Sequence, residues 1–174
     1  DLAEFSVHER YASNISWTGD HSLPPNLTKL YLDNFEQLGD SILLNQQFPD
    51  LQQLSLPSMN ITDRAIPRLS QNVTSISLPK SSEVSGKCFA FLPRGLTFLN
   101  LNSASAVFDC DIQNLPRTLK EVYLNEAIQL TDHCVPDLPR QLELLSLTHN
   151  SKITTSSIPH LPPHCRFPSH RRTV

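Results

Sequence analysis

The stretch Leu115–Pro139, "LPRTLKEVYLNEAIQLTDHCVPDLP", begins and ends on the same Leu-Pro pair. Between the two pairs, "LKEVYL" places three apolar residues at the spacing LxxLxL, and a Thr-Asp pair precedes a short apolar segment. Asp132, His133 and Cys134 stand side by side in that segment. The stretch is therefore either a chemical site or one copy of a repeated structural unit.

The same spacing recurs along most of the chain. Successive copies start 22 to 24 residues apart, and further apolar positions follow three and five residues after each start. The second half of the copies repeats an apolar pattern that closes on leucine, followed by proline in the last four. Such columns across six copies are typical of a solenoid, in which neighbouring units bury one another. The first apolar position is occupied by Leu27, Leu51, Val73, Leu96, Leu119 and Leu142.

Each copy has the pattern of a short strand followed by a single helical turn. The alternation at the end of LxxLxL suits a strand with every second side chain facing the core. Thr-Asp before an apolar segment is typical of a helix N-cap, and a proline about one turn later prevents a long helix. We therefore expect a strand, a turn, one helical or 3-10 turn and a return in every copy.

These motifs resemble the leucine-rich repeat family, on LxxLxL together with "ITDRAIPRL" and "LTDHCVPDL". The resemblance implies an α/β solenoid: a short, curved, right-handed horseshoe with a parallel β-sheet on the concave face and helical or 3-10 turns on the convex face. The family's asparagine at the ninth position occurs here only once, as Asn150, so we expect irregular turns after the strands.

The predicted organisation has three parts. Residues 1–22 are expected to form a degenerate N-terminal capping repeat, with Phe5 and Trp17 covering the edge of the core, although residues 4–13 match a strand poorly. Residues 23–161 form six repeats, and residues 162–174 form a C-terminal cap or a truncated repeat with a tail.

Composition limits the function classes. The net charge of −3 argues against a nucleic-acid partner, and the longest apolar runs are too short to cross a bilayer. The 4 glycines are too few for phosphate-binding loops, whereas the 14 prolines suggest that proline makes the turns. We find no basis for catalysis, and we expect no cofactor and no small-molecule substrate.

Cysteines and sequons point to different compartments. The 4 cysteines form no CxxC pair or clustered framework, so we expect them to be reduced, mostly buried and typical of an intracellular protein. A secreted or surface location remains an alternative because Asn-x-Ser/Thr sequons occur, although repetition also explains two of them. The sequons lie at Asn14, Asn26, Asn60 and Asn72.

Two groups resemble chemical sites. Asp132, His133 and Cys134 could form a nucleophile and base, but Asp132 falls in the column of the Thr-Asp caps and Cys134 in a column of small residues. We therefore interpret them as capping and packing residues. The second group, His160, His164, Cys165 and His170, could bind zinc, but its spacing fits no established zinc motif.

The repeat phase predicts which side chains line the concave face. Large apolar side chains at such exposed positions need a reason, and an interface is one. Phe98, Tyr123 and Leu144 lie in three consecutive repeats and could form one patch. The predicted partner-binding residues are Lys29, Tyr31, Phe98, Asn100, Glu121, Tyr123, Asn125, Leu144 and Ser146.

The sequence thus predicts a non-enzymatic module that binds a protein through its concave face. One alternative is the substrate-recognition part of a larger ubiquitin ligase adaptor or microbial effector. Another is a secreted or surface receptor module. The sequence does not identify the partner.

Overall fold

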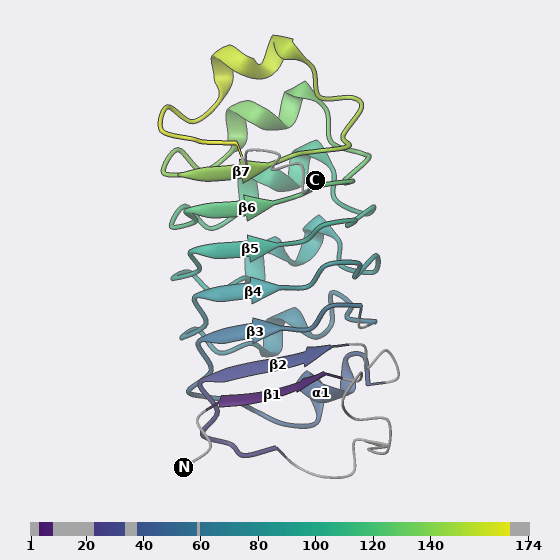
Figure 1. Cartoon of the computed structure of the whole chain (residues 1–174), viewed down its shortest axis with the longest axis vertical. Helices are drawn as coiled ribbons and strands as arrows, with labels where there is room; N and C mark the ends of the chain where they lie inside the picture. Colours follow the sequence, from purple (N-terminus) through teal and green to yellow (C-terminus); the bar gives the residue numbers. More distant parts are fainter. Residues whose placement is uncertain (1–3, 9–22, 34–37, 59, 168–174) are drawn as a thin grey trace, which may run out of the picture.

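The computed structural model describes residues 4–8, 23–33, 38–58 and 60–167. Its main element is a seven-stranded parallel sheet in which each strand pairs with the next strand in the sequence. The strands stack along the long axis of the molecule (Figure 1). They are β1 (Glu4–His8), β2 (Lys29–Asp33), β3 (Gln53–Ser55), β4 (Ser75–Ser77), β5 (Phe98–Asn100), β6 (Glu121–Tyr123) and β7 (Leu144–Ser146).

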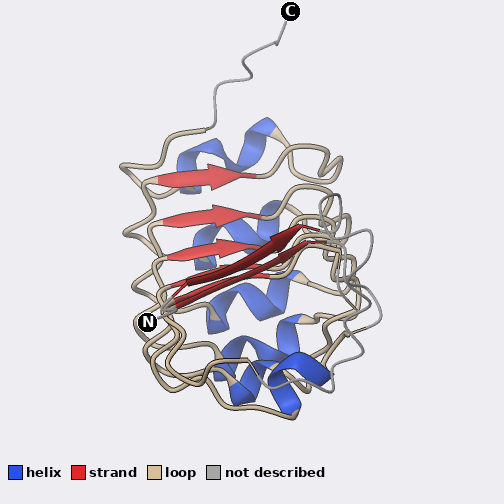
Figure 2. Cartoon of the chain, turned by 60° about the horizontal axis from the view of Figure 1, so that its bottom comes forward, coloured by secondary structure: helices blue, strands red, loops and turns tan. Residues whose placement is uncertain are grey.

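Short helices return the chain between the strands, and they lie on the opposite side of the molecule from the sheet (Figure 2). Within the described ranges all are 3-10 helices except α1, as expected for segments interrupted by proline or limited to one or two turns. They are α1 (Ser41–Leu44), η2 (Ile66–Arg68), η3 (Gly86–Phe91), η4 (Asp109–Asn114), η5 (Asp132–Asp137) and η6 (Thr155–His160). The protein is therefore an α/β solenoid of the leucine-rich-repeat type.

The core lies between the sheet and the helices, and it is built from the apolar columns of the sequence. In the strands these columns pair in register, for example Leu54 with Ile76 and Leu99 with Val122. Their side chains are essentially inaccessible to water. Because one repeat cannot bury its own columns, burial by neighbouring repeats is the main favourable term for this fold.

The chain near the N-terminus forms a strand that the sequence pattern did not predict. In β1, Phe5 pairs with Leu30 and Val7 with Leu32, so Glu4–His8 continues the register of the repeats. The interpretation of this segment as a poor match to a strand was wrong: two apolar residues at the right spacing suffice when a complete strand lies alongside. Trp17 lies outside the described residues.

The turn that follows each of the strands β3 to β7 uses a left-handed residue that is not glycine. Backbone φ lies between 58° and 65° at this same position in five repeats. Proline follows the closing leucines and makes the other turn, where Leu96 N–H donates to the Pro93 carbonyl and Leu119 N–H to that of Pro116. Each repeat thus has two turns, and proline replaces glycine only at the turn after the closing leucine. The prediction that proline makes the turns is confirmed for that turn alone. The left-handed residues are Ser58, Lys80, Ser103, Glu126 and His149.

Aspartates of one repeat hold the helix-start residues of the next. The Asp109 carboxylate accepts hydrogen bonds from Thr131 N at 2.8 Å and Thr131 Oγ1 at 2.5 Å. Thr131 itself caps η5, since its Oγ1 accepts from His133 N at 3.2 Å. Threonine is thus the cap, and aspartate is a bridge between repeats rather than a cap, which corrects the assignment made from the Thr-Asp pattern.

No helix among the described residues is long and apolar enough to span a bilayer.

Candidate interaction surface

The side chains between the buried strand positions form the outer surface of the sheet, here called the sheet face. Parallel register aligns them into ladders, so that Phe98, Glu121 and Leu144 lie on adjacent strands, as do Asn100, Tyr123 and Ser146. Adjacent strands lie about 4.8 Å apart, close enough for side chains of neighbouring repeats to touch. The sheet face is the concave face that the repeat phase predicted.

An aromatic pair lies on the C-terminal half of this surface. The ring centroids of Phe98 and Tyr123 are 5.6 Å apart, and the rings are tilted by 44°. Both side chains are half-buried. Desolvation and the nearby Glu121 carboxylate raise the pKa of the Tyr123 hydroxyl. The neutral phenol therefore persists over a wider pH range and can donate a hydrogen bond there.

Leu144 and Glu121 lie at the border between this pair and a hollow of about 660 Å³. The hollow combines both charge signs, and Lys120 Nζ forms an ion pair with Glu143 Oε1 at 3.0 Å. The half-buried apolar residues thus adjoin a charged rim. The hollow is lined by Lys120, Glu121, Arg140, Gln141, Glu143, Leu144, His164 and Arg166.

The N-terminal half of the sheet face is different. Tyr31 is half-buried, and its hydroxyl donates to Gln53 Oε1 on the next strand. Lys29 lies on the same strand and is also half-buried. The strands β3 and β4 lie between Tyr31 and the Phe98–Tyr123 pair. On the sheet face, these two strands carry Gln53 and otherwise only serines. Tyr31 and Lys29 are therefore separated from the aromatic pair.

Three predicted partner-binding residues of the C-terminal repeats, Asn100, Asn125 and Ser146, form hydrogen bonds within the chain. Asn125 Oδ1 accepts hydrogen bonds from Ser146 Oγ and Thr148 N, both at 2.7 Å. Asn100 Oδ1 accepts from Asn102 N at 3.1 Å. Ser146 is only 3% exposed, so the expectation that it is exposed was wrong. Periodicity gives the face of a residue, but larger neighbours and hydrogen bonds determine how much of it stays accessible.

Sequence reasoning missed two polar residues that shape this surface. Asn102 Oδ1 accepts from Asn125 N at 3.0 Å and so begins a chain of bonds across two repeats. Gln53 orients the Tyr31 hydroxyl. Asparagine occupies equivalent positions in two consecutive repeats, at Asn102 and Asn125. This repetition could have indicated the bridging role of Asn102.

The structure accounts for Asp132, His133 and Cys134 as parts of the scaffold. Asp132 accepts from Thr154 N and Thr154 Oγ1, each at 2.6 Å, and these bonds lower its pKa. Cys134 is buried, and desolvation followed by the charge of Asp109 raises its pKa to about 12. A thiol with so high a pKa is a poor nucleophile at neutral pH.

The structure describes three of the four residues that could bind zinc, His160, His164 and Cys165. Within the described part of the chain, no group of three or more His, Cys, Asp or Glu residues could hold an ion. His160 and His164 are exposed and Cys165 is half-buried. His170 lies outside the described residues.

All four cysteines are free thiols. Cys88 and Cys134 are buried, whereas Cys110 is exposed and Cys165 is half-buried, so the expectation of mostly buried cysteines holds for only two. Of the sequons, Asn26 and Asn72 line a polar hollow with Thr28 and Thr74 at the start of the strands, and Asn60 is exposed. Asn14 lies outside the described residues.

No protein-family model matches the chain, and no curated protein sequence matches it. A chain in the crystal structure of the yeast Rad7 and Elc1 complex is similar in fold, with a TM-score of 0.61 and 16% identity over 82% of this chain and 49% of that chain. The present chain thus spans about half the length of that protein. The leucine-rich repeat-containing protein LegL7 from Legionella pneumophila matches with a TM-score of 0.43 and 15% identity, over 91% of this chain and 71% of LegL7.

The likeness to the yeast structure agrees with the architecture built above. At this level of identity it concerns the fold alone: a leucine-rich-repeat-like α/β solenoid.

Proposed function

We propose that this protein is a non-enzymatic interaction module whose sheet face binds a partner protein around Phe98, Tyr123 and Leu144. The observation that carries the proposal is the half-buried aromatic pair of Phe98 and Tyr123 on a sheet face whose other side chains are mostly polar. Aromatic side chains at such positions contribute large contact area at a low cost in side-chain entropy.

The surroundings of the pair support this location. Leu144 adds an apolar side chain two strands from Phe98, and Glu121 lies between them in the same ladder. A small apolar centre with a charged border is the usual anatomy of a protein interface. The competing explanation is that the rings only stiffen the sheet, in which case their removal lowers stability without affecting a partner.

The test compares two triple variants. Partners captured from a lysate by the wild-type protein are identified by mass spectrometry and then measured with purified components. Phe98→Ala, Tyr123→Ala and Leu144→Ala together should weaken binding by roughly 100-fold or more. The control, Ser55→Ala, Ser75→Ala and Ser77→Ala, alters the same sheet face on the preceding strands β3 and β4, leaves the bond between Tyr31 and Gln53 intact, and should change binding by less than about 3-fold.

Unfolding midpoints separate the two explanations. If the aromatic variant binds its partner as tightly as the wild type while losing stability, the rings serve the sheet and the interface lies elsewhere.

A second candidate function is recognition within a larger assembly, such as a ubiquitin ligase adaptor or a microbial effector. It is favoured by the similarity in fold to a chain from the complex of Rad7 and Elc1, of which the present chain spans about half. Mass spectrometry of the captured material tests this candidate: ubiquitin-transfer enzymes captured along with the partner support the adaptor role. A single stoichiometric partner counts against it.

A third candidate, a secreted or surface receptor module, rests on the sequons alone. Glycan occupancy at the exposed Asn60 or Asn72 after expression in a eukaryotic secretory host would support it.

A further inference from the structure

Three consecutive repeats carry an arginine at the same turn, the one that leads from the closing leucine into the next strand. In each turn a leucine N–H donates to the carbonyl of a proline three residues earlier, as Leu96 does to Pro93 at 3.1 Å, and the arginine directly follows that proline. These turns lie along the edge of the solenoid at which the strands begin (Figure 1). The three side chains are exposed. They belong to Arg94, Arg117 and Arg140, here called the arginine row.

The arginine row is confined to the repeats that carry the proposed interface. Its members stand before β5, β6 and β7, the strands of the aromatic pair and of Leu144. In the three earlier repeats the equivalent position is uncharged, since it holds Pro25, Pro49 and Gln71. Positive charges and apolar interface residues therefore occur on the same three repeats.

Within the described part of the chain, no carboxylate pairs with the arginine row. Arg117 donates to the carbonyl oxygens of Gln113 at 3.1 Å and of Asp137 at 2.9 Å. Arg140 donates to the carbonyl oxygen of His160 at 3.3 Å. Because a guanidinium carries more donors than these bonds use, N–H groups and positive charge remain available to a ligand.

The row continues into the hollow of about 660 Å³ described above, which Arg140 also lines. Of the two carboxylates in the lining, that of Glu143 is paired with Lys120. The charges of Arg140 and Arg166 are thus opposed by one remaining carboxylate, that of Glu121. The edge at which the strands begin is therefore locally basic, although the net charge of the chain is −3.

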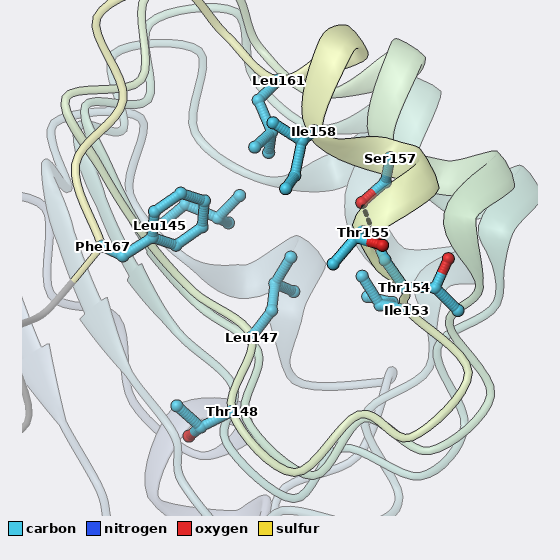
Figure 3. Close-up of a pocket in the computed structure, with 10 residues that line it drawn as sticks. All are labelled: Leu145, Leu147, Thr148, Ile153, Thr154, Thr155, Ser157, Ile158, Leu161 and Phe167. Atoms are coloured by element: carbon cyan, nitrogen blue, oxygen red, sulfur yellow. Dashed lines mark hydrogen bonds between the residues drawn. The ribbon is translucent and has the colours of Figure 1, made fainter.

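The basic surface ends directly after Arg166. Phe167 lines a pocket of about 450 Å³ at the C-terminal end of the solenoid, and none of the residues around that pocket is charged (Figure 3). Ile158 in this pocket is 60% exposed, whereas Val135 and Ile112 occupy the same position in the two preceding repeats and are at most 1% exposed. An open apolar layer thus bounds the basic surface on one side, and the uncharged turns of the earlier repeats bound it on the other.

We propose that the partner of the sheet face carries an acidic segment that binds along the arginine row and into the hollow. The inference rests on the proposed function, because the row adjoins the proposed interface. Neighbouring strands lie about 4.8 Å apart, so the row is longer than one carboxylate and suits a segment with several. Guanidinium groups bind carboxylates through paired N–H donors. A nucleic acid is disfavoured, since the net negative charge of the chain repels a polyanion.

The test uses the full chain and a fluorescent probe peptide that alternates glutamate with serine over about eight residues, a length of roughly 25 Å when extended. A second peptide has glutamine in place of each glutamate. At low salt, the wild type should bind the acidic peptide about 10-fold more tightly than the glutamine peptide, as measured by fluorescence anisotropy. The difference should shrink as the salt concentration rises.

Two triple variants with the same net charge locate the site. Arg94→Gln, Arg117→Gln and Arg140→Gln together should weaken binding of the acidic peptide by roughly 10-fold. The control, Arg64→Gln, Lys80→Gln and Lys87→Gln, removes exposed charges from helices and from turns that follow strands, and should change binding by less than about 2-fold.

The single variant Arg94→Gln separates binding from a structural role. Its guanidinium forms no bond among the described residues, so the variant should unfold at the wild-type midpoint. It should nevertheless weaken binding of the acidic peptide by about 2-fold to 3-fold. This result is expected even if the triple variant, which also loses the bonds of Arg117 and Arg140, does not fold.

Each outcome bears on the proposal. Loss of peptide binding in the arginine variants with retention in the control supports it. Equal binding of the two peptides by the wild type, or equal loss in the control, overturns it. Tighter binding of an oligothymidylate of the same length through the same arginines overturns it in favour of a nucleic acid. The peptides carry no apolar side chain, so Phe98→Ala, Tyr123→Ala and Leu144→Ala should leave their binding unchanged, and the arginine row is tested separately from the proposed function.

Discussion

The carboxylate of Asp111 fills the space that a side chain at position 86 would need. A Cβ atom added to Gly86 would lie 2.0 Å from Asp111 Cβ and Cγ. Between these two repeats the bridge from aspartate to threonine is missing, because Gly86 replaces the aspartate and Phe108 the threonine. Asp111 compensates from within its own repeat by accepting from Phe108 N at 2.9 Å.

Gly86→Ala should therefore destabilise the protein by about 2 kcal/mol or more, because the methyl group collides with the Asp111 side chain and the backbone between two repeats must separate. Gly95→Ala is the control: an added Cβ there meets nothing within 4 Å. The control should be neutral or stabilising by up to about 1 kcal/mol. Urea unfolding measures both. Equal midpoints for the two variants would contradict the packing of Asp111 against Gly86.

Asp132 should make the free energy of unfolding depend on pH in the acidic range. Its hydrogen bonds from Thr154 lower the pKa of the carboxyl in the folded state, so protons bind the unfolded chain more readily. The stabilisation is complete above the unfolded-state pKa and is lost as pH falls through the folded-state value. Denaturant midpoints between pH 6 and about pH 3 should fall less steeply for Asp132→Asn than for the wild type. Identical slopes would argue that the bridge contributes nothing.

Replacing a left-handed residue by glycine should stabilise the solenoid. Lys80 has φ of 65°, where a Cβ atom is strained, and its exposed side chain has no role in the core. Lys80→Gly should raise the free energy of unfolding by about 0.5–1 kcal/mol, the relief of strain exceeding the added entropy of the unfolded chain. Ser82→Gly, two residues away and outside the left-handed positions, should lower it instead. Thermal unfolding of both variants decides the sign.

The thiols should separate into two classes with a disulfide reagent. Cys110 is exposed and should react at once in the folded protein, followed by the half-buried Cys165. Burial and the nearby Asp63 raise the pKa of Cys88, and burial raises that of Cys134 to about 12, so neither should react until the chain unfolds. A Cys110→Ser variant identifies the fast phase. Rapid labelling of all four thiols would indicate that the core opens readily.

The repeat columns allowed most of the fold to be predicted. Leu54, Leu99 and Val122 were assigned to the core from spacing alone, because burial by stacking requires apolar residues at every equivalent position. The strand at Glu4–His8 was missed because its pairing depends on β2 and not on its own pattern. The aspartate bridges were assigned to the wrong partner, since spacing shows a local cap but not a bond to the next repeat.

The sequence by itself determined the solenoid, its repeat length and the face on which Phe98, Tyr123 and Leu144 lie, because these depend on periodicity along the chain. Only the tertiary structure showed that Phe98 touches Tyr123, that Ser146 is buried beside Asn125, and that the last apolar layer around Ile158 is open. These properties arise from contacts between residues about one repeat apart. The distance between two such side chains, and the exposed fraction of each, depend on the size and the hydrogen bonds of their neighbours. A periodic pattern does not contain this information.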